Sequence, residues 1–154
     1  MECSHRMIDQ EQLMNALPEL LQNGAEFPLV ISGSSMYPFL KHGRDTVYLS
    51  KTKRRICVGD MILYRRHGGA PVLHRVVSVC DGELTLLGDR QTALESGVAL
   101  DSVLAIVTAV RRKGRMIRQG HPIWFFFARV WPKMVRIRPK LIRIYAFVNG
   151  DKEI

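Results

Sequence analysis

Short apolar runs separated by turn-forming residues dominate the first 110 positions of the chain. Runs rich in β-branched and aromatic residues predict strands at residues 27–32, 46–50, 61–65, 72–79, 83–87 and 102–110. Glycine-containing turns at 67–70 and 80–83 predict two hairpins. This pattern favours a mainly β fold built on a coiled antiparallel sheet.

Helical periodicity flanks the predicted sheet on both sides. Residues 8–24 carry apolar side chains near helical spacing, which predicts a short N-terminal helix that Pro18 kinks or splits. Beyond residue 118, the apolar and basic positions and the two prolines at 132 and 139 predict two short helices or one kinked helix. We therefore divide the chain into an N-terminal helical arm (1–26), a β domain (27–118) and a basic amphipathic C-terminal helical tail (119–154).

Charge is distributed unevenly along the 154 residues. Residues 1–101 hold 11 Lys and Arg against 12 Asp and Glu, whereas residues 102–154 hold 12 against 2, so the net charge of +9 comes from the C-terminal third. Within the tail, basic residues recur at intervals of four and three and predict one stripe along a helix: Arg129, Lys133, Arg136, Lys140 and Arg143. Such asymmetry suggests an anionic partner for the tail.

Two interpretations of the tail carry similar weight. In one, the basic stripe meets anionic membrane lipid while Trp124, Phe126 and Trp131 enter the interface. In the other, the tail packs on the β domain or on a second copy of the chain. Nucleic acid is a weaker candidate, because the sequence contains no recognisable helix-turn-helix or other reading motif.

Composition indicates a folded protein and gives weak information on location. Hydrophobic residues make up 47% of the chain, and the three cysteines show neither a disulfide framework nor metal-ligand spacing, as is usual in a reducing compartment. The start of the chain lacks the apolar core of a signal peptide, and no apolar stretch is long enough to span a bilayer. We expect a cytoplasmic protein, peripheral at the inner membrane surface if the tail binds lipid.

A serine-rich loop and one histidine are the candidates for chemistry. Gly33, Ser34, Ser35 and Met36 follow the first predicted strand, and a serine becomes a nucleophile when a base and oxyanion donors lie within reach. His74 lies between two valines on one face of a predicted strand, as either a satisfied core histidine or a base in an apolar wall. An ordinary serine-rich turn remains the alternative for the loop.

Four segments together resemble the signal peptidase superfamily, which includes the LexA-type self-cleaving repressors. "SGSSMYPFL", "GDMILYR", "VLHRVV" and "LLGDR" occur in the order and rough spacing of the motifs of that superfamily, over residues 27–110. The resemblance implies a β-rich peptidase fold with Ser35 as nucleophile. Since the histidine-type branch carries its base in an "HR" strand, it also implies His74 as general base.

The resemblance implies further residues of the site, and the sequence departs from it in places. Glu95 is the candidate for the acid that orients His74, with Asp89 and Asp101 as competitors. The superfamily's usual "GD" pair after the serine motif is interrupted here by Arg44, and the polar start of the chain leads us to expect no N-terminal membrane anchor of the signal peptidase kind.

The backbone N–H of Ser35 is the natural oxyanion donor, with the hydroxyl of Ser32 or Ser34 as a possible second donor and Asp89 as a support. The expected function is a serine endopeptidase that cleaves a peptide or protein, such as a leader or signal peptide, without metal or cofactor. The alternative is a catalytically inactive module that binds peptide or membrane. The Arg44 insertion and the lack of a clear choice among the three candidate acids favour this alternative slightly. A self-cleaving regulator ranks below both, and a homo-oligomer is compatible with each.

Overall fold

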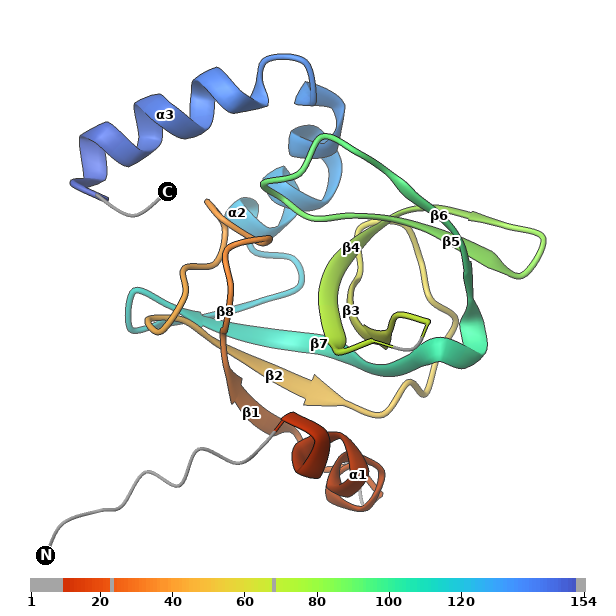
Figure 1. The fold of residues 1–154 in the computed structure, drawn as a ribbon. Coiled ribbons are helices and arrows are strands. Elements are labelled where there is room, and N and C mark those ends of the chain that lie inside the picture. Colours follow the sequence, from red (N-terminus) through yellow and green to blue (C-terminus); the bar gives the residue numbers. More distant parts are fainter. Residues whose placement is uncertain (1–9, 23, 68, 152–154) are drawn as a thin grey trace, which may run out of the picture.

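The structure is a computed structural model that describes residues 10–22, 24–67 and 69–151 (Figure 1). Its strands are β1 (Phe27–Val30), β2 (Thr46–Ser50), β3 (Met61–Arg65), β4 (Pro71–Cys80), β5 (Glu83–Leu87), β6 (Glu95–Ala99), β7 (Val103–Arg112) and β8 (Arg115–Arg118). Its helices are α1 (Gln10–Leu20), α2 (Pro122–Phe125) and α3 (Arg138–Asn149). Helical turns occupy Leu100–Ser102, Phe126–Val130 and Trp131–Met134. The expected mainly β, antiparallel architecture with flanking helices is confirmed, and the start of the predicted first helix lies outside the described residues.

The eight strands form one coiled sheet (Figure 1): seven follow the order β1-β2-β7-β3-β4-β5-β6, and β8 pairs with β7 off this path. Strand β7 changes partner along its length. Its first half pairs with β3 and its second half with β8, while β2 pairs along the opposite edge. Register shifts between Tyr48 and Leu49 and between Leu63 and Tyr64 mark bulges in these pairs, and bulges increase strand twist. The sheet therefore curls, and both faces of β3 are buried.

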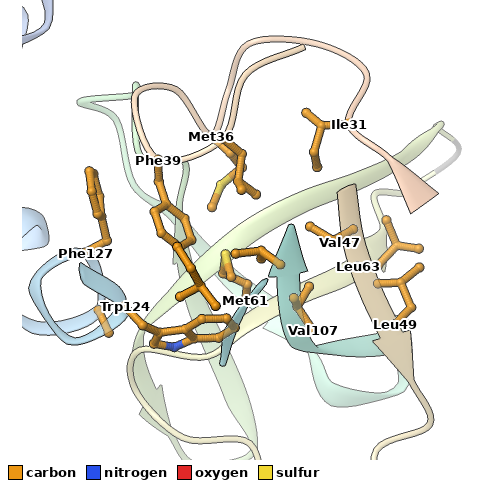
Figure 2. Packing of buried hydrophobic residues seen from close by; sticks show 14 of the residues in the cluster. Ile31, Met36, Phe39, Val47, Leu49, Met61, Leu63, Val107, Trp124 and Phe127 are labelled. Atoms are coloured by element: carbon orange, nitrogen blue, oxygen red, sulfur yellow. The ribbon is translucent and has the colours of Figure 1, made fainter. Parts of the chain in front are cut away.

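Two buried clusters lie on the two faces of this curled sheet. Met61 and Leu63 of β3 belong to the larger cluster, whereas Ile62 and Tyr64 point to the smaller one. The loop between β1 and β2, residues 31–45, is called the serine loop below. Figure 2 shows its Met36 and Phe39 entering the larger cluster beside Met61, Trp124 and Phe127. Leu17 and Leu21 from the N-terminal segment join the same cluster. The arm, the β domain and the tail that the sequence divides thus share one core.

The tail differs from the expected single basic stripe. Trp124 and Trp131 are buried, and the Trp131 indole donates a hydrogen bond of 2.7 Å to the carbonyl of Asp89. This burial corrects the expectation that both indoles enter a lipid interface, because their aromatic surface is already used by the core. Phe126 and the five basic residues of the predicted stripe are exposed, but the basic residues are distributed over three separate helical segments and, for Arg136, the turn before α3.

One arginine fastens the tail to the sheet. The side chain of Arg138 is fully buried, lies over the Trp131 ring, and donates hydrogen bonds to the carbonyls of Gly88, Gln91 and Trp131. A guanidinium can satisfy several carbonyls at once because its donors form a fixed fork. The tail therefore holds the segment that follows β5 in place.

We expect Arg138→Ala to lower the free energy of unfolding by about 3 kcal/mol, because three buried carbonyls lose charged donors. Arg143→Ala is the matched control: this arginine is exposed on the same helix and should change stability by less than about 0.5 kcal/mol. Urea denaturation followed by circular dichroism measures both. Equal stability of the two variants would contradict the role of Arg138.

Candidate active site

The serine loop is held at both ends by backbone and carboxylate contacts. Asp45 is fully buried and accepts hydrogen bonds from the backbone N–H groups of Lys41 and Lys113, at 2.9 and 3.1 Å. Arg44 forms a bidentate pair with the same carboxylate, at 2.8 and 2.7 Å. The inserted arginine thus neutralises the buried acid that closes the loop, and these contacts together lower the pKa of Asp45 against the effect of its burial.

Within the loop, the three serines differ in exposure. Ser32 and Ser34 are exposed, whereas Ser35 is half-buried beside the buried Met36. The Ser35 carbonyl accepts a hydrogen bond of 2.9 Å from the backbone N–H of Arg90. Ser35 is therefore fixed against the segment that follows β5.

Gly88 brings Ser35 close to the strand that carries His74. A Cβ atom added to Gly88 would lie 2.7 Å from the Ser35 carbonyl oxygen, so this approach requires glycine. Strands β4 and β5 pair Arg75 with Leu87, and continuing this register by one residue sets Gly88 opposite His74. Opposed residues of an antiparallel pair lie about 5 Å apart and face the same side. The Ser35 backbone therefore packs against Gly88, one residue beyond the β4–β5 pairing that His74 adjoins.

His74 is 1% exposed and makes one hydrogen bond through its ring. Its Nδ1 atom lies 3.2 Å from the Tyr64 hydroxyl, which lies 2.6 Å from Glu95 Oε2. The direct distance from His74 Nδ1 to Glu95 Oε2 is 3.8 Å. Tyr64 thus bridges the histidine and the acid, while Arg66 donates to both carboxylate oxygens, to Oε2 at 2.6 Å and to Oε1 at 3.0 Å.

The single proton of the Tyr64 hydroxyl decides the tautomer of His74. Arg66 keeps the pKa of Glu95 below its ordinary value, so the carboxylate is ionised and can only accept. Tyr64 must then donate to Glu95 and accept from His74, which places the imidazole proton on Nδ1. A neutral imidazole has one N–H, so Nε2 carries the lone pair.

The lone-pair nitrogen is buried and free. His74 Nε2 has no hydrogen-bond partner among the residues that the structure describes, so it does not hydrogen-bond to the Ser35 hydroxyl in this state. Burial lowers the pKa of His74 to about 4, partly opposed by the negative charge of Glu95. The histidine is therefore neutral at pH 7, and it is an acceptor without a donor.

The three candidate acids occupy different places. Glu95 approaches His74 as described, whereas Asp89 is buried in a bidentate pair with Arg75, at 2.9 and 2.8 Å. Asp101 is exposed and lines a surface cavity of about 560 Å³ together with Tyr64 and Glu95. In the structure, Glu95 thus lies close to the imidazole. Asp89 instead links the segment after β5 to Arg75 of β4.

Tyr64 is the site residue that the sequence analysis missed. Its register partner is Val72, which shares the His74 face of the β3–β4 pair. A buried tyrosine hydroxyl nearly always needs a hydrogen-bond partner, and that requirement was the available signal. Among residues 10–22, 24–67 and 69–151, no three His, Cys, Asp or Glu side chains gather closely enough to hold a metal ion.

No family model matches the chain, and a search of curated proteins finds no relative. In the described part of the chain, no helix has the length and apolar character needed to cross a membrane.

We expect Tyr64→Phe to remove the fixed tautomer of His74, because the Nδ1 proton loses its acceptor. Two-bond proton–nitrogen correlation spectra of the imidazole should show Nδ1–H in the wild type and a mixture of tautomers in the variant. Tyr48→Phe is the matched control, since the side chain of Tyr48 lies on β2, away from His74. An unchanged imidazole signal in Tyr64→Phe would contradict the bridge.

We expect His74 to make the protein less stable in mild acid. Its pKa is about 4 when folded and 6.5 when unfolded, so the unfolded chain binds more protons between these values. This contribution is complete above pH 6.5, and about 3 kcal/mol is lost as the pH falls to 4. His74→Gln should flatten the dependence in that window, measured by urea denaturation at several pH values. Parallel curves for both proteins would show that the imidazole stays accessible to protons.

Proposed function

We propose that the chain is a serine endopeptidase of the signal peptidase and LexA type, with Ser35 as nucleophile and His74 as general base. The observation that best supports this is the buried, unpaired Nε2 of His74, whose lone pair is fixed by the Tyr64–Glu95 bridge. A structural histidine normally satisfies both ring nitrogens, because a buried polar atom without a partner is costly. An unpaired acceptor nitrogen is what a general base for a serine hydroxyl requires.

The reaction follows from these groups. Ser35 Oγ attacks the carbonyl carbon of the scissile bond while its proton passes to His74 Nε2, which forms a tetrahedral oxyanion. The imidazolium then gives this proton to the leaving amine as the C–N bond breaks, which leaves an ester on Ser35. His74 next takes a proton from water, which attacks the ester and restores the serine. Glu95 stabilises the transient imidazolium through Tyr64.

This mechanism requires Ser35 Oγ to approach Nε2 when substrate binds. Catalytic hydrogen bonds are often long or unformed in free enzymes and tighten in the substrate complex. The oxyanion would be bound by the backbone N–H of Ser35, with a hydroxyl from Ser32 or Ser34 as a second donor. Asp89 supports the site indirectly, since its pair with Arg75 braces the strands on which Ser35 rests.

We propose an extended peptide as the substrate. Strand β6 is an edge of the sheet and begins at Glu95, and an edge strand offers unpaired backbone groups to a peptide. A surface hollow of about 510 Å³, lined by Arg66, Arg90 and residues 91–95, adjoins this edge. The resemblance suggests a leader or signal peptide.

We expect a fluorophosphonate probe to label the folded wild-type chain at Ser35. Ser35→Ala and His74→Gln should each slow labelling by about 10³-fold or more, since either change removes one half of a unit that acts together. Ser78→Ala is the matched control, because this serine is exposed on β4. Mass spectrometry of the labelled peptide identifies the site.

The pH dependence of labelling gives a second measurement. Because the folded pKa of His74 is about 4, the rate should stay constant down to about pH 5 and fall only below it. A folded wild type that no serine-directed probe labels would instead favour a non-catalytic peptide-binding module.

A further inference from the structure

Helix α3 (Arg138–Asn149) presents two different faces. Its inner face packs on the body through the buried Arg138, Ile142 and Ala146. Its outer face carries Ile144, Phe147 and Val148, which are 61, 89 and 75% exposed. The helix lies at the periphery of the molecule, so this outer face is open within the described part of the chain (Figure 1).

Cations lie on the same outer face. At 100° per residue, Lys140 and Arg143 fall within the arc that contains Ile144, Phe147 and Val148, opposite Ile142. Both cations are exposed, and neither forms an ion pair with a described residue. The face is therefore apolar and positively charged at once.

No ion pair among the described residues balances the charge on this face. The sequence has no acidic residue between Asp101 and Asp151, and Asp151 is already paired with Lys41 and accepts a hydrogen bond from Tyr37. An anionic partner would supply negative charge that complements Lys140 and Arg143.

From these observations we propose that the outer face of α3 docks on the surface of an anionic lipid bilayer. Ile144, Phe147 and Val148 enter the boundary of the acyl chains, while Lys140 and Arg143 lie among the anionic headgroups. Lipid is the occupant that supplies an apolar layer and negative charge side by side. The inference is independent of the peptidase chemistry, because none of these residues lies in the candidate active site.

Two other occupants fit the face less well. A second copy docked through the same face would bring two pairs of cations together, which is unfavourable without acids to offset them. Nucleic acid would use Lys140 and Arg143 but would leave the three exposed apolar side chains in water. The exposed aromatic and aliphatic side chains of this face therefore favour lipid over a second copy of the chain and over nucleic acid.

Co-sedimentation with vesicles tests the proposal with the full-length chain. We expect the protein to pellet with phosphatidylcholine vesicles that contain phosphatidylglycerol and to stay in solution with pure phosphatidylcholine. Lys140→Glu with Arg143→Glu should weaken partitioning by at least about 30-fold. Phe147→Ser with Val148→Ser should weaken it by at least about tenfold, because the apolar contribution is lost.

Matched controls separate the face from general charge and hydrophobicity. Lys51→Glu with Arg55→Glu makes the same charge change in the exposed loop after β2 and should alter partitioning by no more than about threefold. Val79→Ser with Leu100→Ser removes two other exposed apolar side chains and should have no effect. Ser35→Ala should bind vesicles like the wild type, so a failure of the peptidase proposal would leave this result unchanged.

Three outcomes would overturn the proposal. The first is equal binding to both kinds of vesicle, or to neither. The second is vesicle binding that both α3 double variants retain. The third is a dimer in solution, seen by light scattering without lipid, that Phe147→Ser with Val148→Ser dissociates, because a second copy would then occupy the face.

Discussion

A tyrosine hydroxyl has one proton to donate, and in this protein Tyr64 donates it to Glu95. The candidate site depends on that constraint. Because Arg66 keeps Glu95 ionised, the Tyr64 oxygen is left as an acceptor for His74 Nδ1–H, and the free lone pair falls on Nε2. A direct histidine–carboxylate contact would orient the ring equally well but would raise the pKa of the imidazole more strongly. The intervening tyrosine keeps the acid 3.8 Å away, so burial dominates and the base stays neutral.

The same site depends on packing that begins far away in the sequence. Ser35 lies against Gly88 and Arg90, and this segment is in turn held by Arg138 and by the Trp131 indole. The C-terminal third is therefore part of the framework that positions the serine loop, although its basic composition suggested a tail separate from the β domain. The buried Arg138 guanidinium forms no ion pair with a described residue, and the hydrogen bonds that it donates to three carbonyls, together with the nearby charge of Asp89, make its burial tolerable.

The sequence predicted the sheet better than the site. Strand geometry correctly put His74 on one face with Val72 and Val76, because successive side chains of a strand point to opposite faces. Strand β6, by contrast, was missed, since "ESGVA" has little β propensity and forms only because β5 offers it an edge.

The remaining errors have a common cause. Strand β3 is buried on both faces, so its apolar run conceals which face Tyr64 occupies. The helical periodicity likewise did not predict the burial of Arg138. No local sequence feature distinguishes an arginine that hydrogen-bonds to three carbonyls from an arginine exposed to water. In both cases the function of the side chain is decided by partners distant in the chain: Glu95 for the tyrosine, and the segment after β5 for the arginine.

Helix α3 connects the two surfaces that the proposals concern. At its C-terminal end, Asp151 accepts a hydrogen bond from the hydroxyl of Tyr37 and pairs with Lys41, both in the serine loop. Arg112 reaches from β7 to the Tyr145 hydroxyl and to the carbonyl of Phe39 in that loop. A helix that rests on lipid by its outer face would therefore hold the serine loop close to the membrane surface. Peptides that emerge from or lie on that surface would then meet the loop at raised local concentration.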